Sequence, residues 1–432
     1  MSLLKDLALT LLVVAVFLIA VEGGLRFAGV RYDSSLYRLD RELGYVLRPG
    51  AEGWSVKERE HYERISSQGL RDRVHSLERP AHVIRIAVVG ASFAEAKQVD
   101  QDAAYWSVLE RELNRRLPAG APRVEVINFG VAGYGLAQEY LVIKDKVWQY
   151  DPQIVILSET LHSLVLDSSR KFQTVVGDGP VPYFVRSGSG VVLDDLTVRQ
   201  QRSFVPLGRW ADFLADASNS SRIVSLINAT RRSLSADLTA LRIRARTTRP
   251  AAARQEIDSE DLVLRGPADP DLAEAWQVSE ELIRLCQEQV ERHHAEFWLF
   301  LLDMSPQVDP DPEKRAALEK ELGISDLFVF DRLFAQFARQ EGIAHETLAR
   351  KMLAVAERDH VLLHGFRHRP RNSGHWNETG HRVAGRLIAD ELLNCSKVIR
   401  DNAHPPLDVS GQDCNDDSPG NSSPIRLEAR EP

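Results

Sequence analysis

A serine and a histidine that lie far apart in the chain are the residues best suited to covalent chemistry. Ser92 follows a run of apolar residues at 83–89 and a glycine, Gly90. A serine hydroxyl becomes a nucleophile only when a base takes its proton. His375 stands just before the last predicted helix, and it is the candidate base because an imidazole titrates near neutral pH. The alternatives are a serine that only caps a helix and a histidine on an exposed loop.

A glycine-rich loop is the candidate anion site. Residues 128–135 read Asn-Phe-Gly-Val-Ala-Gly-Tyr-Gly and follow the second predicted strand. Backbone amides in such a loop can turn toward a developing negative charge, as an oxyanion hole requires. A turn that only uses the free dihedral angles of glycine is the alternative. A phosphate-binding loop is disfavoured because no Gly-Lys-Ser/Thr follows.

Strands and helices alternate from residue 83 onward, and this pattern predicts the elements that position these residues. The expected strands cover 83–89, 124–127, 154–157 and 297–302, and the expected helices cover 103–116, 136–148, 272–293, 312–322, 327–341 and 379–393. Strand–helix–strand units imply a parallel sheet with helices on both faces. Right-handed crossovers bring the strand ends, and Ser92, to one edge of the sheet, where ligands bind in such folds.

The composition narrows the class of protein. The chain has 432 residues, of which 44% are hydrophobic and 27% charged, and its net charge is -8. It is long enough for one large domain with additions or for two domains. A nucleic-acid partner is disfavoured because it would call for a basic domain. The oligomeric state is left open.

Metal and cofactor sites are not predicted. The three cysteines, Cys286, Cys395 and Cys414, form no Cys-x-x-Cys pair, so a structural zinc site is disfavoured. A bridge between Cys395 and Cys414 and three unpaired thiols are both compatible with the sequence. A metal site is disfavoured as well, because glycine and proline interrupt any helix that would align the four histidines near His375: His360, His364, His368 and His381.

The N-terminus departs from a soluble pattern. Residues 7–21 are apolar with one threonine, and 23–30 continue mostly apolar after Glu22. Together they are long enough to cross a bilayer if Glu22 and Arg26 reach toward its surface. We therefore predict an uncleaved signal anchor at 1–30, with a cleaved signal peptide as the alternative. The arginines after the span would place the body in the cytoplasm by the positive-inside rule.

The rest of the chain divides into three further parts. A polar lead-in covers 31–80, and an α/β domain covers 81–395 with an insertion at about 165–270. The tail at 396–432 is rich in Asp, Asn, Ser and Pro, which predicts disorder. The insertion contains a cluster of arginines that is either a solvated face or a contact for anionic lipid or acidic polysaccharide: Arg242, Arg244, Arg246, Arg249 and Arg254.

The ordered motifs resemble the SGNH (GDSL-type) hydrolase family, and most closely its membrane-anchored bacterial branch. These motifs are Gly-x-Ser-Phe at 90–93, the loop at 128–135 and His-Trp-Asn-x-x-Gly-His at 375–381. The resemblance implies a flavodoxin-like three-layer α/β/α sandwich and ester hydrolysis or acyl transfer outside the cytoplasm. It implies that Ser92 is the nucleophile, that His375 is the base, and that the amides of Ser92 and Gly133 are oxyanion donors. We follow it in expecting a single-pass membrane protein with an extracytoplasmic (periplasmic) body.

Three blocks of the sequence depart from the family pattern. Ala91 replaces the aspartate of the first block, and Ser163 stands about where the third block has an oxyanion asparagine. Asn372 and Ser373 stand where the last block carries the aspartate that orients the histidine. The prediction is therefore an ester hydrolase or O-acyltransferase with a Ser92–His375 dyad, acting on an acylated glycan or lipid. A catalytically inactive relative that binds an acylated glycan, or a scaffold for an envelope complex, is the alternative.

Overall fold

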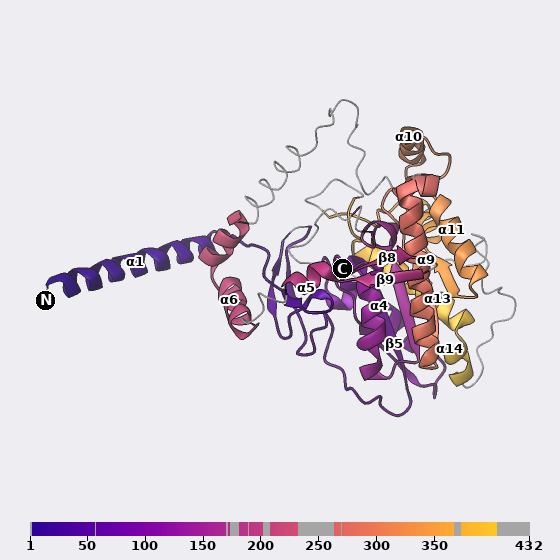
Figure 1. Cartoon of the computed structure of the whole chain (residues 1–432), viewed down its shortest axis with the longest axis horizontal. Helices are drawn as coiled ribbons and strands as arrows, with labels where there is room; N and C mark the ends of the chain where they lie inside the picture. The colour runs from indigo at the N-terminus through magenta and orange to yellow at the C-terminus, as the bar shows by residue number, and fades with distance from the viewer. Residues whose placement is uncertain are drawn as a thin grey trace.

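The computed structural model describes residues 2–56, 58–169, 172, 181–188, 190–201, 208–231, 263–268, 270–366 and 373–403. A single helix, α1 (Ser2–Phe27), projects from an α/β body (Figure 1). Its residues Leu4–Phe27 are long and apolar enough to be a membrane span or a signal anchor, and no part of this stretch is buried in the structure.

A parallel sheet of five strands forms the centre of the body. Its strands, in spatial order, are β6 (Arg123–Asn128), β5 (Val83–Gly90), β7 (Ile154–Glu159), β10 (Glu296–Leu301) and β11 (Ala344–Thr347). All four neighbouring pairs are parallel. With the first strand of the sheet between the second and the third, this is the flavodoxin-like order 2-1-3-4-5. The predicted fold class is confirmed.

Both faces of the sheet are buried, as its apolar strands predict. On β5, Ile84, Ile86 and Val88 belong to one hydrophobic core, whereas Ala87 and Val89 belong to the other. This follows from the strand geometry, because successive side chains point to opposite faces. Each face therefore needs a layer of helices to cover it.

Three helices cover each core. The core that contains Ala87 and Val89 is covered by α4 (Leu136–Asp145), α9 (Pro270–Arg292) and α11 (Val329–Gln340). The core that contains Ile84, Ile86 and Val88 is covered by α3 (Tyr105–Arg116), α12 (Ala349–Asp359) and α13 (Glu378–Cys395). Short helices join these layers: α2 (Ser92–Glu95), η1 (Gln101–Ala103), η2 (Val147–Tyr150) and α10 (Pro312–Leu322).

Three elements of this body differ from the sequence prediction. The pattern did not predict β11 or α12. The tail expected to be disordered from residue 396 begins with a helix instead, α14 (Lys397–Asn402), whose first turn is capped by the Ser396 hydroxyl. Residues 404–432 lie outside the described residues. Cys395 is disulfide-bonded and Cys286 is free and buried, while Cys414 lies outside the described residues.

The lead-in folds into two β-hairpins. β1 (Tyr37–Asp40) pairs with β2 (Gly44–Leu47), and β3 (Glu52–Ser55) pairs with β4 (His61–Arg64). A fully buried ion pair fixes the second hairpin: Arg71 Nε lies 2.6 Å from Glu63 Oε2. Arg71 also donates to the carbonyl oxygen of Val99 at 2.6 Å. The lead-in is therefore joined to the α/β body by buried polar contacts.

The segment between β7 and α9 forms a separate group of elements. These are η3 (His162–Leu166), the hairpin β8 (Tyr183–Ser187) and β9 (Gly190–Asp194), α5 (Leu196–Gln201), α6 (Gly208–Ser220), a helix at 222–231, and η5 (Val263–Ala268). The arginine cluster predicted at 242–254 lies outside the described residues.

Candidate active site

Ser92 lies just past the end of β5, which has β6 on one side and β7 on the other, so the strand order reverses at this point of the parallel sheet. It opens the short helix α2, and Ala91 before it has a non-helical backbone. Gly90 is required at this turn, because a side chain there would place its Cβ 2.5 Å from the carbonyl oxygen of Ser158 on β7. As the first residue of a helix, Ser92 keeps its amide outside the helical hydrogen-bond ladder. Its hydroxyl and amide are thus presented at the sheet edge.

His375 meets Ser92 across this edge. The distance between His375 Nε2 and Ser92 Oγ is 2.7 Å, although 283 positions separate them in the chain. Phe93 packs beside the imidazole, with ring centroids 4.9 Å apart. The structure therefore brings together the two residues that the sequence singled out as nucleophile and base.

A third residue, Glu58, completes a chain of hydrogen bonds. His375 Nδ1 lies 2.9 Å from Glu58 Oε1. A carboxylate only accepts, so Nδ1 carries the proton and Nε2 is free to accept the hydroxyl proton of Ser92. Only 11% of the Glu58 side chain is exposed, against 24% for His375. In this geometry the Glu58 carboxylate orients the imidazole. The sequence offered no residue for this role, because Asn372 and Ser373 carry no carboxylate.

The turn between β3 and β4 carries Glu58 to the histidine loop. Gly374 has a φ of +77°, which favours glycine, and a Cβ there would lie 3.1 Å from Glu58 Oε1. Next to Glu58, Arg59 donates to Glu378 Oε1 at 2.5 Å, at the start of α13. Glu58 therefore reaches His375 because the loop is bare at Gly374 and because an ion pair joins the two segments.

A second histidine–carboxylate pair braces the loop from behind. His364 Nε2 lies 2.6 Å from Asp303 Oδ2, and His364 Nδ1 lies 2.7 Å from the carbonyl oxygen of Gly374. Trp376 donates from Nε1 to the other oxygen of Asp303 at 2.8 Å. All three side chains are buried. These contacts hold the backbone on both sides of His375, and they use both ring nitrogens of His364.

The glycine-rich loop is clamped at Ala132. The Ala132 amide donates to Glu95, and the Ala132 carbonyl oxygen accepts from the Tyr45 hydroxyl at 2.9 Å. Gly133 follows with a φ of 80°. Glu95 also accepts from the Tyr37 hydroxyl at 2.7 Å, and burial together with this carboxylate raises the pKa of Tyr37 well above its usual value. Gly133 is thus held in a fixed turn one residue beyond the clamp.

Ser163 is engaged elsewhere. Its hydroxyl accepts from the Thr160 amide at 3.1 Å and donates to the Thr160 carbonyl oxygen at 3.2 Å, so it closes the turn after β7. The structure does not bring this side chain to Ser92 or His375 among the contacts of the described residues. The expectation that Ser163 stands in for the oxyanion asparagine has no geometric support here, because its shorter side chain bonds its own turn.

Two carboxyl groups beneath this turn are fully buried. Burial and the neighbouring Glu159 raise the pKa of Glu139 well above its usual value. Burial also raises the pKa of Glu159, to about 7, although contacts with Glu139 and Ser163 lower it. Glu139 therefore keeps its proton at neutral pH.

The remaining histidines form no ligand set. Burial lowers the pKa of His381 well below its usual value, so its ring is neutral, and its Nδ1 accepts from the Tyr105 amide at 3.3 Å. Over the part of the chain that the structure describes, no group of three or more His, Cys, Asp or Glu side chains is arranged to hold a metal ion. His368 and Asn372 lie outside that part.

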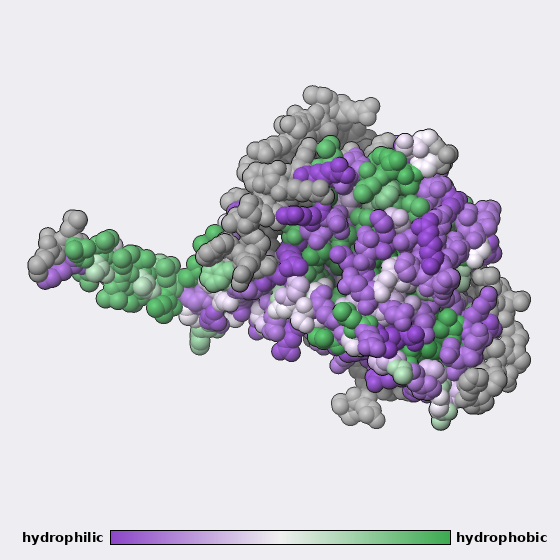
Figure 2. All heavy atoms as spheres, turned by 60° about the horizontal axis from the view of Figure 1, so that its bottom comes forward, coloured by the Kyte–Doolittle hydropathy of each residue, from purple (hydrophilic) through white to green (hydrophobic). Residues whose placement is uncertain are grey.

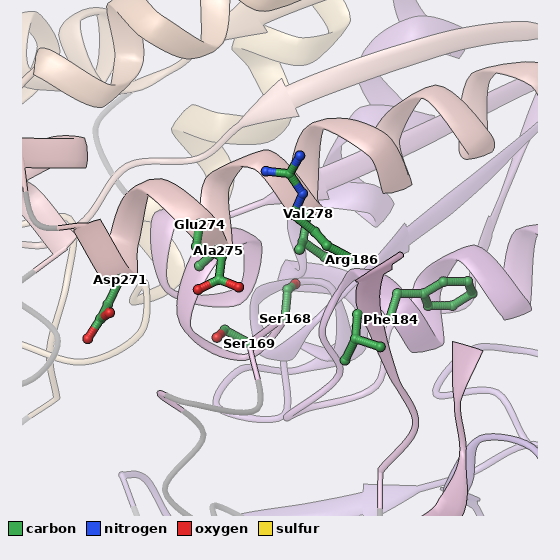
Figure 3. A pocket seen from close by; sticks show the side chains of 9 residues that line it. Ser168, Ser169, Phe184, Arg186, Asp271, Glu274, Ala275 and Val278 are labelled. Atoms are coloured by element: carbon green, nitrogen blue, oxygen red, sulfur yellow. The ribbon is translucent and has the colours of Figure 1, made fainter. Parts of the chain in front are cut away.

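A separate cavity of about 270 Å³ lies between α9 and β8 (Figure 3). Figure 3 shows hydroxyl groups of the loop after η3 facing the carboxylates of α9 across it. Its lining residues are Ser168, Ser169, Phe184, Val185, Arg186, Asp271, Glu274, Ala275 and Val278. None of the three hydrogen-bonded residues, Ser92, His375 and Glu58, belongs to this lining.

Glu58 is the residue that the sequence did not reveal. It stands in Lys-Glu-Arg-Glu at 57–60, a charged run that looks like any solvent-exposed turn. The sequence contains one indirect indication of it. The loop before His375 has no acidic residue at the expected position, so a complete site needs a carboxylate from another segment.

Comparisons with known proteins give structural matches only. No family model and no curated protein matches the sequence. A lipolytic protein assigned to the G-D-S-L family from Desulfitobacterium hafniense matches at 12% identity, over 71% of this chain and 98% of that one, with a TM-score of 0.31. The acetyl xylan esterase AlAXEase matches at 12% identity, over 71% and 96%, with a TM-score of 0.33.

A third match is a catalytic mutant of Axe2, an acetylxylan esterase from Geobacillus stearothermophilus. It shares 8% identity over 71% of this chain and 93% of that one, with a TM-score of 0.34. Similarity at this level says nothing about activity, so the family resemblance depends on the motifs and the strand order. The structure itself shows a parallel sheet in the order 2-1-3-4-5, with Ser92 just past the end of its first strand.

Proposed function

We propose that this protein is an ester hydrolase in which Ser92, His375 and Glu58 act as a catalytic triad. The observation that carries the proposal is the continuous chain of hydrogen bonds from Ser92 Oγ through both nitrogens of His375 to Glu58. Serine–histidine–carboxylate chains of this geometry perform acyl transfer on several unrelated folds, and they are defined by geometry and not by sequence position.

The chemistry follows from the direction of the hydrogen bonds. Ser92 Oγ attacks the carbonyl carbon of the ester while His375 Nε2 takes the hydroxyl proton. Glu58 stabilises the imidazolium through the Nδ1 proton. The tetrahedral oxyanion is held by the amides of Ser92 and Gly133. His375 then returns the proton to the leaving alcohol, and water attacks the acyl-enzyme by the same route.

The site works with one oxyanion donor fewer than the family pattern, because Ser163 is bonded to its own turn. Removal of one such donor costs about 10²–10³ in rate in well-studied hydrolases. We therefore expect a modest turnover with unactivated esters. If a sugar hydroxyl replaces water at the acyl-enzyme, the same residues perform O-acyl transfer. The proposed substrates are O-acyl groups on an extracytoplasmic glycan or lipid.

A non-catalytic role was the alternative because neither a carboxylate beside the histidine nor the oxyanion asparagine was apparent. Glu58 supplies the carboxylate, whereas the asparagine has no replacement at Ser163. Catalysis is the function that these contacts favour.

A covalent probe tests the proposal directly. The full chain in detergent is treated with a fluorophosphonate and assayed on p-nitrophenyl acetate, beside Ser92→Ala and the control Ser107→Ala, a serine on α3 away from the site. Labelling and turnover should persist in the control and fall at least about 10⁴-fold in Ser92→Ala. A folded protein with no labelling and no turnover would refute the proposal.

The membrane location is a proposal of its own. The described helix α1 fits a span, and the family resemblance places the body outside the cytoplasm, whereas the charges after the span point the other way. A pair of reporters fused after Pro432, one active only outside the cytoplasm and one only inside, decides between them. A signal from the cytoplasmic reporter would overturn the periplasmic assignment.

A further inference from the structure

The helix at 222–231 exposes apolar side chains and buries polar ones. Ile227 is 58% exposed, and Val224 and Leu226 are also exposed, whereas Ser225 is only 8% exposed. On α6, the helix before it, Phe213 is 60% exposed. A surface helix of a soluble domain shows the opposite arrangement, with its apolar stripe facing the core.

Polar contacts fill the inner face of this helix. Ser225 Oγ donates to the carbonyl oxygen of Ser218 on α6 at 2.6 Å, and Asn228 Nδ2 donates to Ser218 Oγ at 2.7 Å. Small and polar residues that join two helices, with apolar residues turned outward, are typical of helices that pack in lipid. We call α6 and the 222–231 helix the helix pair. The arrangement of its side chains suits an apolar medium on its outer side.

The helix pair is joined to the end of α1. Glu22 accepts from the Arg222 amide at 2.9 Å and from the Ile223 amide at 3.0 Å, so an acidic residue of α1 caps the 222–231 helix. Ser221 Oγ lies 3.1 Å from the same carboxylate. Arg26 donates to the Ser220 carbonyl oxygen. Figure 1 shows α6 at the inner end of α1, where α1 meets the body.

The helix pair is also joined to the lead-in. The Ser35 amide donates to Asn219 Oδ1 at 2.7 Å, and Asn219 Nδ2 donates to the Glu52 carbonyl oxygen at 3.1 Å. Arg48 pairs with Asp216 of α6. The polar residues of the pair thus face α1 and the body, whereas Val224, Leu226 and Ile227 are exposed. Figure 2 shows that apolar surface extends along α1.

We propose that the 222–231 helix and Phe213 of α6 lie in the surface of the membrane that α1 enters, with their apolar side chains in the boundary between headgroups and acyl chains. The occupant of this face is lipid, because the face adjoins the exposed apolar surface of α1 and the helix carries Arg222 and Arg231 but no acidic residue. Helices of this kind sink about 5–10 Å into the boundary. The inference depends on the proposal that α1 spans the membrane.

Such a second contact sets the orientation of the active site. A body held by α1 alone is free to tilt, whereas a body held by α1 and the helix pair presents one fixed side to the membrane. The β3–β4 hairpin that carries Glu58 is attached to this junction through the contact between Asn219 and Glu52. The site is therefore held at a fixed height and direction relative to the bilayer surface.

Spin labels measure this in the full chain. Nitroxide labels are placed one at a time on Val224→Cys and Ile227→Cys, in nanodiscs of phosphatidylethanolamine and phosphatidylglycerol, and their access to oxygen and to a water-soluble nickel chelate is compared. Phe17→Cys on α1 is the lipid reference, and Leu77→Cys, on an exposed lead-in position, is the water reference. The signal from the unsubstituted chain, whose Cys286 is buried, is subtracted.

The labels at 224 and 227 should match the lipid reference, with high oxygen access and at least about a threefold lower nickel access than at 77. If the labels at 224 and 227 match the water reference while the label at 17 is in lipid, the interface proposal is overturned and the membrane anchor is still supported. Labels that neither reagent reaches indicate contact with a second copy and also overturn it. A water-like label at 17 refutes the anchor, and the interface proposal fails with it.

Discussion

Two histidine–carboxylate pairs lie on neighbouring segments of this protein and have different tasks. His375 and Glu58 are partly exposed, and the free nitrogen of His375 faces the Ser92 hydroxyl. His364 and Asp303 are fully buried, and the second nitrogen of His364 faces a backbone carbonyl. The two histidines differ in the group that the second ring nitrogen contacts. The Ser92 hydroxyl can give its proton to His375, whereas the Gly374 carbonyl oxygen can only accept a hydrogen bond from His364.

The comparison indicates that the buried pair fixes the position of the loop whose histidine belongs to the partly exposed pair. Asp303 holds Trp376 and, through His364, the carbonyl oxygen of Gly374, so it restrains both neighbours of His375. We infer that one pair serves catalysis and that the other maintains its geometry. The following variants are ordered from the largest expected effect to the smallest.

Glu58→Gln should nearly abolish activity without unfolding the protein. The amide can donate to Nδ1 and stabilise the wrong tautomer of His375, and in other triads such a change lowers the rate by about 10⁴. The measurement is kcat/KM on p-nitrophenyl acetate with circular dichroism as the check on folding. Glu60→Gln, in the same turn, should leave kcat/KM within about twofold, because exposed ion pairs such as Arg31–Glu60 contribute little. Equal activity in wild type and Glu58→Gln would reduce the site to a dyad.

Asp303→Asn should act mainly on stability. Removal of one partner from a buried pair leaves the other without compensation, and this costs about 3–5 kcal/mol. The measurement is the free energy of unfolding in urea, with kcat/KM recorded where the variant is still folded. Activity per folded molecule should fall by no more than about tenfold. A variant that is stable but inactive would instead place Asp303 in the catalytic machinery.

Glu159→Gln should change how stability depends on pH, because Glu159 faces another carboxyl group and not a histidine. Its pKa is about 7 when folded and near the ordinary 4.5 when unfolded. The folded state thus holds the proton more tightly, so stability is greatest below pH 4.5 and is lost as the pH rises through 7. The loss is on the order of a few kcal/mol. The variant should lose less stability between pH 5 and pH 8, as measured by urea unfolding; equal losses would contradict the raised pKa.

Arg59→Gln should have the smallest effect. It removes the ion pair with Glu378, in which both side chains are more than a third exposed, so at most about 1 kcal/mol is lost. We expect kcat/KM to fall about two- to fivefold, and 1 M NaCl should lower the wild-type value by a similar factor but not that of the variant. A drop as large as that of Glu58→Gln would mean that Arg59 itself contacts the substrate.

The sequence predicted the fold through its apolar runs. Four of the five strands were expected, because each is a run of apolar residues bounded by turn signals. The fifth, β11, reads Ala-His-Glu-Thr, and at the edge of the sheet it is held by its pairing with β10 and not by an apolar pattern. Its strand character comes from tertiary context, which local propensity does not contain.

The sequence predicted the site less completely. Ser92 and His375 were identified because each follows a recognisable motif, and the structure brings them together. Glu58 was missed because its position depends on how a hairpin docks against a loop more than 300 residues away. Ser163 was expected at the position of the oxyanion asparagine, but its hydroxyl turns back to Thr160, and spacing alone does not decide which hydrogen bond a side chain forms.

The distance along the chain between Glu58 and His375 has a consequence for biosynthesis. The two residues are 317 positions apart, and Glu58 precedes Ser92 in the chain. The acid and the nucleophile leave the ribosome early, whereas the base that connects them arrives only near the end of synthesis. Since contacts of such separation form late, we expect the chain to carry an inert serine until its synthesis is nearly complete. The proposed triad is therefore assembled only when the last helix has folded onto the body.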